Sequence, residues 1–158
     1  MTDSDGVALS AGIKAAGSNR ILFALIAILS LAGIIVSAIS LQRHYAKSAT
    51  EFCDISQQFS CDIVNRSEYS SIMGIPVAGI GVAGYAALLL LATLWKSQAK
   101  TPLRLLAAAM AGLAFALYLT YIEAYVLETW CILCVISLVL MSLIAVLTLI
   151  VKLRSANA

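Results

Sequence analysis

The sequence predicts an all-α membrane protein: a bundle of four transmembrane helices with an external loop that contains a short interfacial helix. Of its 158 residues, 62% are hydrophobic and only 11% are charged, whereas a soluble domain usually carries about 25% charged residues. Because so few charges cannot cover a surface that faces water, we expect the lipid bilayer to be the solvent. The net charge of +2, without a Lys- or Arg-rich block, argues against nucleic acid as a partner.

Four apolar stretches are each long enough to cross a membrane, for which a helix needs about 20 residues. Apart from Arg104 at the edge of the third, they contain no Asp, Glu, Lys, Arg or His. Only helices and closed barrels satisfy the backbone in lipid, and these runs are too long and continuous for barrel strands. The predicted spans are Ile21–Leu41, Pro76–Trp95, Leu103–Ile122 and Cys131–Val151.

The first span follows a polar segment, residues 1–20, and this arrangement imitates a signal peptide. The apolar run Ile21–Leu41 is, however, longer than the roughly 7–15 apolar residues of a signal peptide. We therefore interpret it as a retained anchor. Residues 1–158 are predicted to form a single membrane domain, in which segment 42–75 is the only substantial external loop.

The charges predict the orientation of the helices. Seven of the ten cations flank the spans on the side of the chain termini: Lys14, Arg20, Lys96, Lys100, Arg104, Lys152 and Arg154. The opposite side holds six of the eight acids: Glu51, Asp54, Asp62, Glu68, Glu123 and Glu128. The positive-inside rule then places both termini in the cytoplasm. All four cysteines fall on the external side, where disulfides form and persist.

The motif Trp130-Cys131-Ile132-Leu133-Cys134 opens the last apolar run. Two thiols three positions apart at a helix start can close into a disulfide and reopen, so the pair predicts a two-electron redox centre. Thr129 is expected to cap the helix. Cys131 would then lie in the first turn, near the positive end of the helix dipole, which lowers the pKa of a thiol.

Two other interpretations of this pair stay open. Buried free cysteines often act as small hydrophobic residues. Four cysteines can also bind zinc, but Cys53 and Cys61 are separated by seven residues, and the single His44 lies at the other end of the loop. We therefore expect no metal site.

The external loop contains the other two cysteines, Cys53 and Cys61. Ser60 is expected to cap a short helix that starts at Cys61, with Asp62 favourable in its first turn. Lying along the membrane surface, this helix would bring Cys61 toward Cys131. A static bridge that only staples the loop is the alternative. Two cysteine pairs, one at the membrane and one outside it, favour an electron relay.

These motifs together closely resemble the vitamin K epoxide reductase family, including its bacterial disulfide-forming members. The resemblance extends from the first span to the last. It implies a four-helix bundle around a quinone, with Cys131 and Cys134 as the quinone-side centre and Cys134 nearest the ring. It implies also that Cys53 and Cys61 shuttle electrons from a thioredoxin-like dithiol protein. The matching features are Cys53-x7-Cys61, Ser67, Gly74-Ile75-Pro76 and Trp130-Cys131-Ile132-Leu133-Cys134.

The resemblance also implies contacts for the quinone. Ser67 matches a family serine near the quinone, and the depth of Cys134 in the membrane places Val77, Ile80, Tyr121 and Leu138 in the expected pocket. Vertebrate members carry a Tyr at the position of Leu138, and an Asn in the stretch that here reads Val77-Ala78-Gly79-Ile80. Both departures favour an ordinary membrane quinone, ubiquinone or menaquinone, over vitamin K epoxide.

The predicted function is therefore quinone-dependent thiol oxidation that supports disulfide formation. Many family members carry a fused thioredoxin-like domain; this sequence has none, so we expect the partner in trans. The expected location is a bacterial inner membrane, with the cysteines on the periplasmic side. The alternatives are reduction of vitamin K epoxide or of its quinone and, in a different class, a tetraspan adhesion or structural protein with a loop disulfide.

Overall fold

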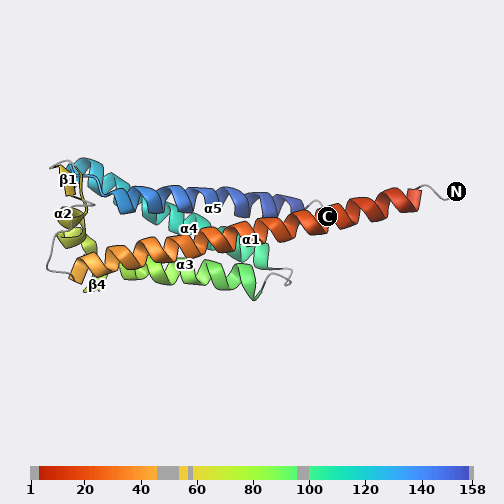
Figure 1. The fold of residues 1–158 in the computed structure, drawn as a ribbon, viewed down its shortest axis with the longest axis horizontal. Coiled ribbons are helices and arrows are strands. Elements are labelled where there is room, and N and C mark those ends of the chain that lie inside the picture. Colours follow the sequence, from red (N-terminus) through yellow and green to blue (C-terminus); the bar gives the residue numbers. More distant parts are fainter. Residues whose placement is uncertain (1–3, 46–53, 57–58, 96–99, 157–158) are drawn as a thin grey trace.

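The computed structural model describes residues 4–45, 54–56, 59–95 and 100–156. Its long helices run along a common direction, and the short elements gather at one end (Figure 1). The long helices are α1 (Ser4–Tyr45), α3 (Val77–Thr93), α4 (Thr101–Ile122) and α5 (Ile132–Ala156). The short elements are β1 (Asp54–Ser56), β2 (Phe59–Ser60), α2 (Cys61–Arg66), η1 (Glu68–Ser70), β3 (Ser71–Ile72), β4 (Ile75–Pro76) and the π-helical turn η2 (Glu123–Leu127).

Three helical segments have the length and apolar composition to cross a membrane: Asn19–Tyr45, Thr101–Leu127 and Ile132–Ala156. The apolar helix α3 is shorter, with 17 residues, which lies at the lower limit for a transmembrane helix. The predicted all-α membrane bundle is therefore confirmed. Its helix ends differ from the prediction, because α1 already begins at Ser4 and α4 continues through η2 without a break.

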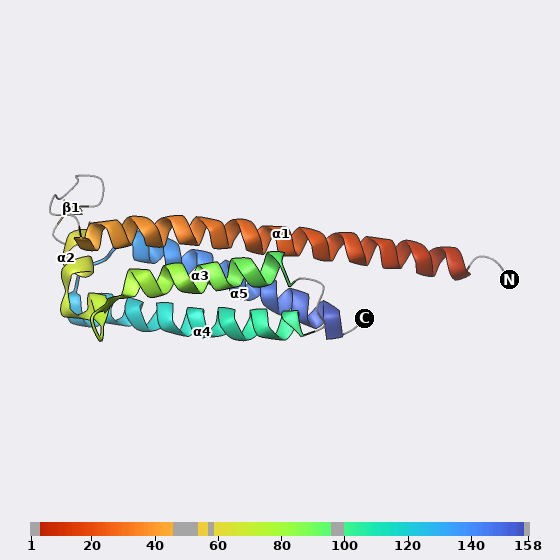
Figure 2. The same cartoon turned by 90° about the horizontal axis from the view of Figure 1, so that it is seen from below.

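The helices pack in a fixed pattern: α1 lies against α3 and α5, and α4 lies against α5 and α3. Seen from below, α3 and α4 lie side by side, while α1 extends beyond the others at its N-terminal end (Figure 2). Gly33 of α1 makes the close approach to α3 possible, since a Cβ there would lie 2.3 Å from Cε1 of Tyr85. Tyr85 is almost fully buried, together with Ile26 and Leu88.

The short elements cover one end of the bundle. Ser60 caps α2, as the sequence predicted, because its hydroxyl accepts a hydrogen bond from the N–H of Ile63 at 3.3 Å. Strands β1 and β2 pair antiparallel, as do β3 and β4. The turn between β3 and β4 is formed by Met73 and Gly74, both with positive φ.

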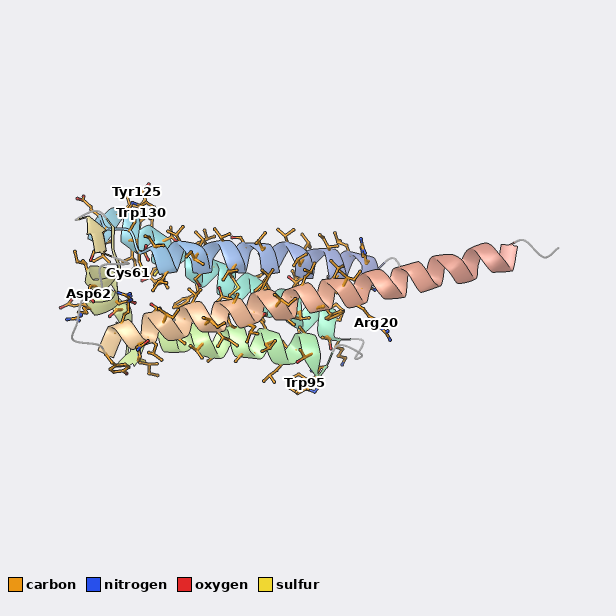
Figure 3. All side chains as sticks on the ribbon, in the orientation of Figure 1. Arg20, Cys61, Asp62, Trp95, Tyr125 and Trp130 are labelled. Atoms are coloured by element: carbon orange, nitrogen blue, oxygen red, sulfur yellow. The ribbon has the colours of Figure 1, made fainter. Side chains whose placement is uncertain are left out.

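The two ends of the bundle differ in charge and carry aromatic side chains. Cys61, Asp62, Tyr125 and Trp130 lie at one end, and Arg20 and Trp95 at the other (Figure 3). Tyr and Trp are typical of the two membrane–water interfaces, so these side chains mark the limits of the apolar layer. The first turns of α1 and the last turns of α5 lie away from α2, toward the opposite end of the molecule (Figure 1).

Candidate redox site and cavity

The two thiols of the last span lie at the start of α5. Cys131 is fully buried and Cys134 partly buried, and both are free thiols. The N–H of Val135 donates to the carbonyl of Cys131 at 3.0 Å, which makes Cys131 the residue that precedes the first turn. The prediction that Thr129 caps this helix was wrong, because its hydroxyl donates to the carbonyl of Leu127 at 3.1 Å.

The N–H of Cys131 is instead held by Glu123, whose Oε2 accepts its hydrogen bond at 3.1 Å. Glu123 is the first residue of η2. A π-turn widens the helix and is frequent at functional sites; here it ends at Glu128, which takes the left-handed conformation. Glu123 lies at the same end of the bundle as the cysteines, but its side chain is only 2% exposed, so it faces the site and not the solvent.

The short helix α2 brings Cys61 to the membrane pair, as the sequence predicted. Cys61, Val64 and Cys131 form one buried cluster, and both cysteines are 0% exposed. Cys61 is disulfide-bonded, whereas Cys131 and Cys134 are free, so the partner of Cys61 is neither of these two. The fourth predicted residue, Cys53, lies outside the described residues.

The surroundings of Cys131 favour its thiolate. The Cys134 side chain hydrogen-bonds to its sulfur and, together with the N–H groups of Cys134 and Leu133, lowers the pKa of Cys131 below that of an ordinary thiol. Burial and the Glu123 carboxylate oppose this effect but do not cancel it. The direction agrees with the sequence-based expectation, although the hydrogen bonds replace the helix dipole as its main cause. A lowered pKa raises the thiolate fraction of Cys131 and also makes it a better leaving group, so it suits exchange with the neighbouring Cys61 in either direction.

A cavity of about 380 Å³ lies beneath α2, between the long helices. Cys134 lines it, whereas Cys131 does not. Its walls are mostly apolar, with Val36 of α1, Leu88 of α3 and Phe115 of α4 among them. Small-molecule sites are typically apolar hollows of about 300–1,000 Å³ with a few polar groups. The cavity therefore has the size and character of a site for a flat apolar ring next to Cys134.

Polar groups on the cavity wall are held in fixed orientations. The hydroxyl of Ser40 donates to Oδ1 of Asn65 at 2.7 Å, and Nδ1 of His44 lies 2.6 Å from the Asn65 carbonyl oxygen. On the other side, the Tyr85 hydroxyl donates to the Ser137 carbonyl at 2.9 Å. Asn65 is 7% exposed, and its Nδ2 has no hydrogen-bond partner among the described residues. This amide group is available to a ligand.

The predicted quinone contacts divide into two groups. Ser67, Val77 and Ile80 line the cavity, with the Ser67 hydroxyl donating to the carbonyl of Val64 at 2.8 Å. Tyr121 and Leu138 are not brought to it. Tyr121 is 59% exposed and its ring lies against that of Tyr125, with 4.9 Å between the ring centroids. Three of the five predicted residues thus line the cavity, and the other two do not.

Sequence reasoning missed two residues of the site, Glu123 and Asn65. Glu123 could have been found, since it is the only acid inside an otherwise apolar helix that continues to Leu127, and ionisable residues within spans are usually functional. Asn65 gave no such signal, because it lies in a loop rich in polar residues. Among the described residues, no group of three or more His, Cys, Asp or Glu could hold a metal ion.

Comparison with known protein families agrees with this site. The sequence model of the group described as "Vitamin K epoxide reductase family" matches residues 24–149, which is most of the chain. The match includes α2, α3 and α4 completely, α1 from residue 24, and α5 up to residue 149 with Cys134 and the preceding Cys131. The chain therefore belongs to this family, whose members are oxidoreductases that use quinones.

Proposed function

We propose that this member of the vitamin K epoxide reductase family is a quinone-dependent thiol oxidoreductase that supports disulfide formation. One observation carries the proposal: Cys61 and Cys131 share a buried cluster, while Cys134 lines an apolar cavity. The same short motif thus connects the external loop with a site inside the bundle. A merely structural loop disulfide would require neither the two free thiols nor the cavity.

Electrons reach the membrane pair by thiol–disulfide exchange. The thiolate of Cys61 attacks the sulfur of Cys131 in the Cys131–Cys134 disulfide, and the Cys134 thiolate leaves. Cys53 then attacks Cys61, so that a Cys53–Cys61 disulfide forms and Cys131 is released as a thiolate. The exchange moves two electrons inward, and the two protons of the loop dithiol pass with them to the α5 sulfurs, which end as the Cys131 and Cys134 thiols; no other reactant is consumed. The described pattern, with Cys61 oxidised and both α5 thiols free, corresponds to the state after this transfer.

The second half of the cycle takes place at the cavity. The thiols of Cys131 and Cys134 become a disulfide, and their two electrons and two protons pass to a membrane quinone, which leaves as the quinol. The protein binds the ring between apolar walls, with Asn65 and Ser67 as polar contacts, and the quinone supplies the oxidising power. Ubiquinone and menaquinone both suit such a site.

The electron donor is proposed to be a thioredoxin-like dithiol protein supplied in trans. A folded partner cannot reach Cys131, which is fully buried beneath α2, so it must react with the loop pair. The distribution of charges favours the non-cytoplasmic side for this loop, and we propose that this side is the periplasm of a bacterial inner membrane. That compartment contains the dithiol substrates that the cycle requires.

The proposal is tested by trapping its intermediate in the Cys134→Ser variant. In that variant Cys131 still attacks Cys61, but the serine cannot resolve the bond. We expect a Cys61–Cys131 disulfide and a free Cys53 thiol, detected by non-reducing peptide mapping. In parallel, the wild-type protein should oxidise a thioredoxin-like dithiol anaerobically with ubiquinone-1 or menadione, and reduce no vitamin K epoxide. An intact loop disulfide beside a free Cys131 would refute the relay, and a wild type inactive with every quinone would refute the function.

A further inference from the structure

Glu123 has an unusual position for a carboxyl group. It follows the apolar helix α4, is 2% exposed and faces the start of α5. Burying a charged carboxylate is costly, even after the protein has relaxed around it. Its observed hydrogen bond, from the N–H of Cys131 to Oε2, employs one of its two oxygens. An amide side chain could accept that bond equally well, so capping alone does not explain a carboxylate.

The second carboxylate oxygen of Glu123, Oε1, indicates what the carboxylate could do. Oε1 of Glu123 is buried and accepts no hydrogen bond from the residues that the structure describes. Glu123 lines the cavity, as does Cys134, and the carboxyl and the Cys134 thiol are close enough to interact. A proton acceptor without a partner therefore lies beside the thiol that faces the cavity. Asn65 provides the only other side-chain atom on the cavity wall with the same lack of a partner among the described residues.

From this geometry we propose that Glu123 accepts the proton that Cys134 loses when it reacts in the cavity, and passes it to the quinone oxygen. The inference rests on the proposed function and extends it. The Cys134 S–H bond breaks and its proton moves to Oε1; the S–S bond to Cys131 then forms. The two electrons of the dithiol reduce the quinone. One of the two protons of the quinol comes from Glu123 and the other from the Cys131 thiol.

Glu123 also positions the start of α5 for the oxidation of the two thiols, through its hydrogen bond to Cys131. By holding the N–H of Cys131, it fixes the start of α5 relative to η2. The titratable groups around it are the thiols of Cys131 and Cys134 on α5. Tyr85 of α3 and His44 of α1 line the same cavity, while Cys61 of α2 is disulfide-bonded and does not titrate.

The test is the Glu123→Gln variant, because glutamine keeps an oxygen for the N–H of Cys131 but cannot take up a proton. Proton transfer by a positioned side chain usually contributes about 10²–10⁴-fold. We expect the single-turnover reduction of ubiquinone-1 by the prereduced variant to be about 100-fold slower. Its dissociation constant for ubiquinone-1, and its thiol–disulfide exchange with dithiothreitol in the absence of quinone, should stay within about twofold of wild type. Glu128→Gln removes an exposed carboxylate from the same turn and is the matched control.

The pH dependence of the wild type provides a second test that does not depend on the folding of a variant. Acid protonates the carboxylate in advance, so the single-turnover rate should fall on the acidic side, and Glu123→Gln should lack this limb. The inference would be overturned if the Glu123→Gln variant reduced the quinone as fast as an active wild type. It would also be overturned if the single-turnover rate of the wild type did not fall at acidic pH. In both cases an active wild type leaves the proposed function intact, whereas a wild type inactive with every quinone refutes that function itself.

Discussion

Replacing Asn65 by leucine should weaken quinone binding by an amount that the cavity geometry predicts. The hydroxyl of Ser40 donates to Oδ1 of Asn65 at 2.7 Å, which fixes the amide so that Nδ2 faces away from Ser40. Nδ2 is buried and has no partner among the described residues, and Asn65 lines the cavity. A quinone carbonyl is therefore the natural acceptor for this N–H group.

The magnitude follows from the net value of one neutral hydrogen bond, about 0.5–1.5 kcal/mol. This corresponds to a dissociation constant about 2- to 12-fold higher in the variant. Leucine preserves the approximate volume of the side chain, so the cavity should keep its shape. The assay is titration of the purified protein in lipid nanodiscs with ubiquinone-1, followed by the quenching of tryptophan fluorescence.

The Ser40→Ala variant is the matched control for this prediction. It keeps the Asn65 amide and removes only the hydroxyl that orients it, so its effect should be smaller than that of Asn65→Leu. Neither variant should alter the exchange between Cys61 and Cys131, because Asn65 lines the cavity, whereas Cys61 and Cys131 do not. An unchanged dissociation constant in Asn65→Leu, with the loop disulfide intact, would refute the assignment of Nδ2 as the donor.

Two further predictions concern packing and orientation. Gly33→Ala should destabilise the protein by about 1–3 kcal/mol, because the added Cβ would overlap the Tyr85 ring. Gly79→Ala is the control and should be nearly neutral, since the atom nearest to its Cβ lies at 3.7 Å. Equal shifts in the melting temperature of the two variants would contradict this view of the α1–α3 contact. In intact cells, a membrane-impermeant thiol reagent should label Glu68→Cys but not Ser155→Cys, both exposed positions, and the reverse pattern would invert the proposed topology.

The helices could be predicted because lipid leaves few alternatives. Apolar runs of about 20 residues without charges have to be helical in a bilayer. Helix ends are less constrained, since a polar segment can continue a helix into water. Residues 1–20 contain several alanines, the best helix former, and α1 indeed begins at Ser4. The π-turn η2 had no local signal at all, because it depends on the contact between Glu123 and Cys131.

The sequence could indicate the depth of the cavity in the membrane, but not which face of each helix lines it. Depth follows from the rise of about 1.5 Å per residue, and the cavity does reach Cys134, Val77 and Ile80. The face of α5 that lines the cavity, however, runs through Cys134, Ser137 and Met141, with Leu138 off this line. Which of two neighbouring faces turns inward depends on the packing partners, here on Met141 against Gly112 of α4. A single sequence does not contain that information.

The buried carboxylate and the apolar cavity together explain how the site separates its two reactions. In the proposed cycle, exchange with the loop involves Cys61 and Cys131, which share a buried cluster and do not line the cavity. The proposed reaction in the cavity involves Cys134, which is partly buried and lies beside Glu123. A single hydrogen bond to a charged group contributes about 1.5–3 kcal/mol, less than the several kcal/mol that burial of a carboxylate costs. The single hydrogen bond to Cys131 therefore does not offset that cost by itself, and the position of Glu123 beside both thiols and the cavity agrees with the proposed proton transfer. In this scheme electrons enter through the buried contact between Cys61 and Cys131, and protons leave the dithiol at Cys134, where an acceptor is present.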